Sequence, residues 1–103
     1  MIENNIYVEV HCLRPSWISD EKNKYRLYLN DELLSERDWT WGLNTVVAEN
    51  IWVNLPAGNH ILKIEPILYP ANSIAYFALR HLKLNSRFLP DWGGERTELS
   101  FLL

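Results

Sequence analysis

Hydrophobic and polar residues alternate along several short segments of this chain, as they do in strands that bury one face. The clearest segment is Ile6–Leu13. Because side chains of a strand point alternately to its two faces, one face of this segment carries Ile6, Val8, Val10 and Cys12. Arg14-Pro15 ends the strand, since proline has no backbone N–H to donate. The polar residues 16–24 then predict a loop.

A β-hairpin is predicted next. Tyr25 to Asn30 alternates again, with Tyr25, Leu27 and Leu29 on one face. Asn30-Asp31 supplies residues that tolerate the positive φ of a tight turn. The chain is therefore expected to return from Glu32 to Trp41 as the partner strand, before a break at residues 42–44.

The middle of the chain predicts two strands joined by a turn. Residues 46–55 form a long apolar segment whose inward phase contains Ile51, Val53 and Leu55. Residues 56–59 have the proline and glycine of a turn, so residues 60–69 are expected as the opposing strand. Pro66 within that strand indicates an edge position or a bulge.

The last third of the chain predicts two further strands. After a turn at residues 70–73, residues 74–84 are apolar enough for a central strand. Residues 86–95 are rich in proline and glycine and predict a loop. Residues 97–103 alternate once more and are expected to form a closing strand.

Turn signals thus recur about every ten residues with no convincing helix between them, which is typical of antiparallel sandwiches and barrels. A chain of 103 residues is long enough for one compact core. We expect residues 1–103 to form a single all-β domain. The predicted fold is an antiparallel, jelly-roll-like β-sandwich of about seven or eight strands.

Charge and composition exclude several classes of function. The net charge of −3 provides no basic surface for nucleic acid or anionic membranes. The single cysteine, Cys12, excludes an internal disulfide. The start of the chain lacks the pattern of a signal peptide, and no apolar segment is long enough to span a bilayer. We expect a protein in the cytoplasm of the producing cell, with incorporation into a virion as a further destination.

The sequence offers little support for a metal site. The soft ligands are His11, Cys12, His60 and His81, without the spacing of a zinc motif. Asp91 and a nearby glutamate flank a Gly-Gly pair, but this loop matches no calcium-binding spacing. No cofactor is expected.

Catalytic groups are also sparse. No serine has the context of an activated nucleophile, and no glycine-rich phosphate loop is present. Glu36, Asp38 and Glu49 could pair as acid and base, but solvated faces or ion pairs with Arg37 and Lys63 are the favoured interpretation. We expect no enzyme activity.

The aromatic residues are the most informative candidates. Trp39 and Trp41 share one face of the predicted return strand, where a position in the core is favoured over a ligand platform. Trp52 is out of phase with its apolar neighbours, which predicts exposure. Trp92 follows Asp91 in the glycine-rich loop. The candidate ligand- or partner-binding residues are Trp39, Trp41, Trp52, Asp91 and Trp92.

Two segments carry a resemblance to known proteins. YRLYLNDELLSE and IWVNLPAGNHILKIEP, together with FALRHLKLN, resemble small jelly-roll or galactose-binding-like sandwiches of the carbohydrate-binding-module type. LLSERDW is similar to a segment of short β proteins of T4-like cyanophages. The matching parts cover about half of the chain. The resemblance implies a β-sandwich without known catalytic machinery.

Three functions follow as hypotheses. The first is a non-enzymatic binding or assembly module, a phage structural or accessory protein that acts through protein–protein contacts at an exposed edge strand or apolar patch, including self-association. The alternative is a carbohydrate-binding module that uses exposed tryptophans. The third is a small hydrolase or isomerase based on Glu36, Asp38 and Glu49.

Overall fold

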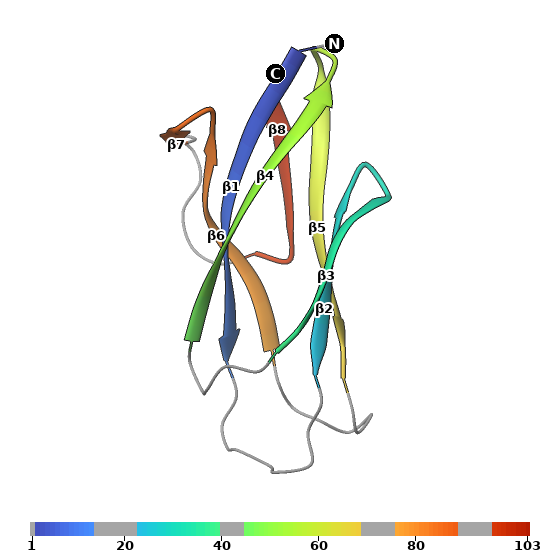
Figure 1. The fold of residues 1–103 in the computed structure, drawn as a ribbon, viewed down its shortest axis with the longest axis vertical. Helices are drawn as coiled ribbons and strands as arrows, with labels where there is room; N and C mark the ends of the chain where they lie inside the picture. Colours follow the sequence, from blue (N-terminus) through green and yellow to red (C-terminus); the bar gives the residue numbers. More distant parts are fainter. Residues whose placement is uncertain (1, 14–22, 40–44, 69–75, 89–95) are drawn as a thin grey trace.

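The chain folds into two antiparallel sheets that pack face to face in an elongated sandwich (Figure 1). The computed structural model describes residues 2–13, 23–39, 45–68, 76–88 and 96–103. The first sheet has the order β4-β1-β6-β7, and its strands are β1 (Ile2–Leu13), β4 (Thr45–Leu55), β6 (Tyr76–Leu84) and β7 (Arg87–Phe88). The second sheet has the order β3-β2-β5-β8, and its strands are β2 (Lys24–Leu29), β3 (Glu32–Asp38), β5 (Asn59–Ile67) and β8 (Glu98–Leu102). The predicted all-β antiparallel sandwich is confirmed.

The core lies between the two sheets and is built by the alternation seen in the sequence. Ile6, Val8, Val10 and Cys12 of β1 are all 0% exposed, as predicted. The second sheet contributes the inward residues of β2, β5 and β8. Those residues are Tyr25, Leu27, Leu29, Leu62, Ile64, Leu99 and Phe101.

An aromatic cluster closes part of this core. The ring of Trp39 meets Phe77 edge to face, with centroids 5.4 Å apart. It also lies 6.2 Å from the ring of Tyr25. Trp39 is 7% exposed, so the interpretation of this residue as core is confirmed and its role as a ligand platform is not supported. Edge-to-face geometry adds stabilisation beyond the buried area of the rings.

Two tight turns have positive φ at both central residues. Asn30 and Asp31 adopt φ values of 51° and 68°, which confirms the predicted β2–β3 hairpin. Its return strand was predicted to reach Trp41, but it ends at Asp38. Asn85 and Ser86 repeat this geometry with φ values of 50° and 69° and join β6 to β7. Residues 86–95 are predicted as a loop, but Arg87 and Phe88 form the two-residue strand β7.

The expected pairing of residues 46–55 with residues 60–69 is wrong. Strand β4 pairs with β1, whereas β5 lies in the other sheet between β2 and β8. The Pro56–Asn59 turn has positive φ at Gly58 only, unlike the two hairpin turns. The segment between β4 and β5 takes the chain from the first sheet to the second, where β5 pairs with β2 and β8.

The remaining strand predictions hold with adjustments. Strand β6 lies between β1 and β7, as expected for a central strand. Its pairing with β1 shifts register between Tyr7 and Glu9, and His81 takes a φ of 53° nearby. Pro66 lies beyond the part of β5 that pairs with β8, so among the described strands its neighbour is β2 alone. None of the described residues forms a helix that could cross a bilayer.

Candidate functional site

The most distinctive surface feature is the open edge of β4. This strand ends the first sheet and pairs with β1 over its whole length, from Ile2↔Leu55 to Cys12↔Thr45. No described strand pairs with its other edge. The backbone groups of an edge strand form a template to which another strand can add.

The other edge strands of the sandwich have features that hinder pairing with a strand of another chain. Strand β3 has a bulge in its pairing with β2, and charged residues occupy most of its length. Strands β7 and β8 have only two and five residues. Strand β4 has eleven residues, no proline, no break in its register with β1, and a single charge at Glu49. Among the described strands, β4 is therefore the long edge with the fewest barriers to association, since its one inward-pointing charge, Glu49, is paired with Arg37.

The outer face of β4 is uncharged. Its residues are Val46, Ala48, Asn50, Trp52 and Asn54, which alternate with half-buried residues that pack against the core. Trp52 is 63% exposed, which confirms the exposure predicted from its phase. An exposed indole beside small and amide side chains is suited to contact with a ligand or a partner protein.

The one charged residue of β4 is neutralised inside the sandwich. Glu49 shares the inward phase of Ile51 and is only 2% exposed. Arg37 of β3 reaches across from the second sheet, and its Nε and Nη2 donate to the two carboxylate oxygens. The hydroxyl of Tyr25 donates to the same carboxylate. These contacts hold the edge of β4 against the β2–β3 hairpin.

The protonation states of this cluster follow from its contacts. Burial of Tyr25, followed by its hydrogen bond to Glu49, raises the pKa of the tyrosine hydroxyl well above its usual range. The hydroxyl therefore stays protonated and remains a donor. The hydrogen bond to Glu49 likewise raises the pKa of Arg37.

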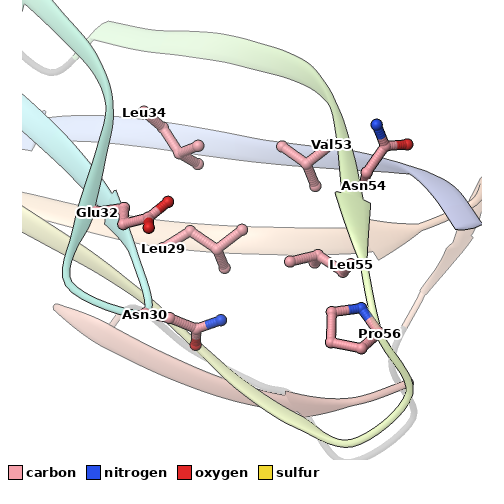
Figure 2. Close-up of a pocket in the computed structure, with 8 residues that line it drawn as sticks. All are labelled: Leu29, Asn30, Glu32, Leu34, Val53, Asn54, Leu55 and Pro56. Atoms are coloured by element: carbon pink, nitrogen blue, oxygen red, sulfur yellow. The ribbon is translucent and has the colours of Figure 1, made fainter. Parts of the chain in front are cut away.

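A pocket opens between the two sheets near the end of β4 (Figure 2). It has a volume of about 520 Å³. Leu29 and Leu34 face Val53 and Leu55 across it, while polar side chains stand at its rim. The rim amide of Asn30 is already bonded to the His60 ring and to the backbone N–H of Ile61, each at 2.9 Å. The pocket thus offers an apolar floor rather than a set of polar ligands.

Amide side chains lie beside Trp52 on the outer face of the first sheet. Asn5 of β1 is the cross-strand partner of Trp52, and Tyr7 is the partner of Asn50. The side-chain amide of Asn5 donates to the amide oxygen of Asn50. The Nζ atom of Lys83 lies 5.1 Å from the centre of the Tyr7 ring, within range of a cation–π contact.

The same face carries a carboxylate whose hydrogen bonds are internal. Glu9 accepts from Tyr7 Oη and Arg80 Nε, each at 3.1 Å. The Nδ1 atom of His81 also lies 3.1 Å from Glu9 Oε1. Burial alone would raise the pKa of Glu9, but these hydrogen bonds outweigh it and lower the pKa. A carboxylate with three protein partners serves structure rather than ligand binding.

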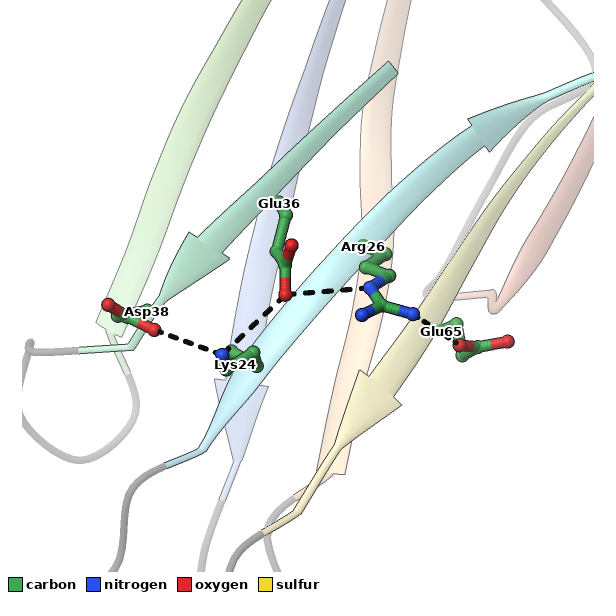
Figure 3. A network of polar contacts seen from close by, with 5 residues as sticks. All are labelled: Lys24, Arg26, Glu36, Asp38 and Glu65. Atoms are coloured by element: carbon green, nitrogen blue, oxygen red, sulfur yellow. Dashed lines mark ion pairs between the residues drawn. The ribbon is translucent and has the colours of Figure 1, made fainter. Parts of the chain in front are cut away.

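The outer face of the second sheet carries a network of exposed ion pairs (Figure 3). Lys24 lies 3.6 Å from Glu36 and 3.8 Å from Asp38. Arg26 lies 3.5 Å from Glu36 and 4.0 Å from Glu65. Water screens such pairs, so they contribute little to stability and give this face a balanced charge.

The predicted site residues therefore do not form a single site. Trp39 is in the core and Trp52 is on the surface, so the structure does not bring them together. Trp41, Asp91 and Trp92 lie outside the described residues. Sequence reasoning missed the pocket and the amides of Asn5 and Asn50.

The predicted acid and metal groups do not converge either. Glu36 and Asp38 lie on the outer face of the second sheet, whereas Glu49 is buried between the sheets. The described residues contain no group of three side chains suited to hold a metal ion. The His60 ring is bonded to the Pro56 carbonyl oxygen at 2.8 Å, and Cys12 lies in the core. The calcium candidate around Asp91 lies outside the described residues.

Comparison with known proteins adds no family. The chain matches no protein-family model, no curated protein and no solved structure.

Proposed function

We propose that this protein is a non-enzymatic binding module that acts through protein–protein contacts, by accepting an extended strand of a partner at the open edge of β4. The observation that carries the proposal is the eleven-residue edge of β4, which lacks charge on its outer face, proline and bulges. Strand addition supplies main-chain hydrogen bonds for affinity and alternating side chains for specificity.

The side chains around the edge fit this mode of binding. An added strand would direct alternate side chains to the outer face, beside Trp52, and to the inner face, toward the pocket that contains Leu34 and Val53. Trp52 would act as the aromatic anchor, since tryptophan is enriched at energetically dominant interface positions. The ion pair of Glu49 with Arg37 keeps the edge in place without leaving an unpaired charge.

The biological setting is also part of the proposal. The similarity of LLSERDW to short cyanophage β proteins supports a structural or accessory role in a phage. Such a protein would be made in the cytoplasm of the producing cell and could be built into a virion.

The proposal is tested by hydrogen-exchange mass spectrometry on protein diluted until light scattering shows a monomer. An open edge leaves about half of the amides of residues 46–54 fast to exchange, since alternate N–H groups of an edge strand point away from its neighbour. Strand β1, which has partners on both sides, should exchange slowly and serves as the internal control. Uniform protection of residues 46–54 in the monomer would contradict the proposal.

Binding is tested with a capped synthetic peptide of residues 46–54, chosen because it can pair along the whole edge. Addition of the peptide should protect the fast amides of β4 from exchange. The matched control is the same peptide with proline in place of the asparagine at position 50, which removes a backbone donor from its centre. Equal effects of the two peptides, or no effect of either, would argue against strand addition.

A second candidate function is carbohydrate binding on the outer face of the first sheet. The specific observation is Trp52, 63% exposed, beside the amides of Asn5 and Asn50. An exposed ring can stack on the apolar face of a sugar while amides bond its hydroxyls. Titration with a glycan panel should quench tryptophan fluorescence in the wild-type protein but not in Trp52→Phe, and it should leave the β4 amides fast to exchange. If no glycan of the panel quenches the fluorescence, this candidate function is wrong.

A further inference from the structure

We infer that the strand that adds to β4 is β4 of a second copy of this chain, in antiparallel orientation about a two-fold axis. The inference rests on the proposed function, because it names the occupant of the same edge. It would join the first sheets of the two copies into one continuous sheet. A two-fold axis gives a closed dimer, the commonest form of protein self-association.

Charge is the first argument for a second copy. Pairing about a two-fold axis places each strand opposite itself, so a charged residue near the axis would face its own copy and destabilise the pair. The outer face of β4 has no charged residue between Val46 and Asn54. On the inner face, Glu49 is already paired with Arg37 of its own copy.

The second argument is the register that gives the longest overlap. With the axis at Asn50, Val46 lies opposite Asn54 of the second copy, and the whole of β4 is paired. Trp52 then lies opposite Ala48 of the second copy. Side chains directly opposite in antiparallel strands are about 4.5–5.5 Å apart at Cβ, so the small alanine leaves room for the indole. The largest exposed side chain of β4 thereby gains a packing partner.

The inner face gains contacts in the same register. Val47 of the second copy lies opposite Val53, which with Leu34 lines the pocket between the sheets. Val47, Ile51 and Val53 are only partly buried in the single chain, although they pack against its core. Pairing would bury them further at the side of the pocket that the single chain leaves open.

A pair of charge variants at the predicted axis tests the dimer. We expect size exclusion with light scattering to show the wild-type protein at twice its chain mass of 12.2 kDa as its concentration rises. Asn50→Lys and Asn50→Glu should each weaken the dimer about twofold to fivefold, because like charges meet at the axis. An equimolar mixture of the two variants should restore association, since opposite charges then face each other.

The matched control is Ser100→Lys, which places a charge at an exposed outer-face position of β8, away from β4. It should leave the dimer unchanged. A dimer that both Asn50 variants leave intact would overturn the inference, because its interface would lie elsewhere. Two weakened variants that fail to recover when mixed would overturn the register.

A wild-type protein that stays monomeric up to about 1 mM, where a dimer with a Kd near 1 mM would be detected, would also overturn the inference. The proposed function is judged separately, by exchange at residues 46–54 and by the synthetic peptide. A monomer with fast β4 amides that binds the peptide would keep strand addition and exclude a second copy as the occupant. A monomer with protected β4 amides would overturn both.

Discussion

Replacement of Arg37 with methionine should destabilise the fold by about 2 kcal/mol, because it leaves the carboxylate of Glu49 buried without its cation. Methionine keeps an apolar stem of similar length, so the change removes charge and hydrogen bonds more than packing. Glu49 is 2% exposed and would retain only the Tyr25 hydroxyl among the contacts described above.

The magnitude follows from the contacts. Loss of one partner of a fully buried pair costs about 3–5 kcal/mol. The Arg37 side chain is 48% exposed, so water already screens part of this interaction. The variant loses two hydrogen bonds to a charged group, and the screening by water reduces their contribution. The expected loss in free energy of unfolding is therefore about 2 kcal/mol. In a domain of this size the loss corresponds to a fall in melting temperature of roughly 10 °C.

The assay is urea unfolding near pH 7 at one fixed protein concentration, followed by tryptophan fluorescence and circular dichroism. Arg26→Met is the matched control, because Arg26 also pairs with carboxylates but on the exposed face of the second sheet. It should cost less than about 0.5 kcal/mol. The double variant Arg37→Met/Glu49→Gln should recover part of the loss. If Arg37→Met costs no more than Arg26→Met, the reasoning is refuted.

Three further predictions test other parts of the fold. In thermal or urea unfolding, Trp39→Ala should lower the free energy of unfolding by about 3–5 kcal/mol. Trp52→Ala in the monomer should lower it by less than about 0.5 kcal/mol. Similar losses for the two variants would contradict the assigned burial. Because the pKa of Tyr25 is raised in the fold, the native state keeps a proton that unfolded tyrosine loses near pH 10. Stability should therefore fall above about pH 10, and Tyr25→Phe should reduce that slope in urea titrations at successive pH values. Asp31→Val should lower the free energy of unfolding by about 1–2 kcal/mol in the same assay, because the φ of 68° at this position is strained for a branched residue. An equal loss in Asp31→Gly would refute this explanation.

Alternation in the sequence was sufficient to predict most strands and their buried faces. The inward phases of β1 and β2 and the Asn30-Asp31 turn were all predicted from local pattern. Alternation reports which face of a strand is buried, but it does not report which strand lies alongside. The assignment of β4 and β5 to different sheets depends on the turn at Pro56–Asn59 and on pairing with distant strands, so it could not be derived locally.

In the candidate site, too, the sequence predicted which side chains are exposed or buried but not which strands lie side by side. Phase alone separated the exposed Trp52 from its apolar neighbours. Glu49 also had a local signal, since a carboxylate on the inward phase of an amphipathic strand requires a buried partner. The sequence named Arg37 as a partner, but neither the contact across the two sheets nor the open edge of β4 follows from spacing. Both arise from sheet order, which is a property of the whole fold.

The central position of β1 in the first sheet has a consequence for biosynthesis. One of its two partners is β6, and the Leu13↔Tyr76 pair joins residues separated by 63 positions (76 − 13). At a synthesis rate of about 5–20 residues per second, β1 waits roughly 3–13 seconds on the ribosome before that partner is made. The apolar face of Ile6, Val8 and Val10 is covered by the second sheet, whose last strand, β8, is made later still. Strand β1, which has partners on both sides in the first sheet, is therefore enclosed only after most of the chain has been made.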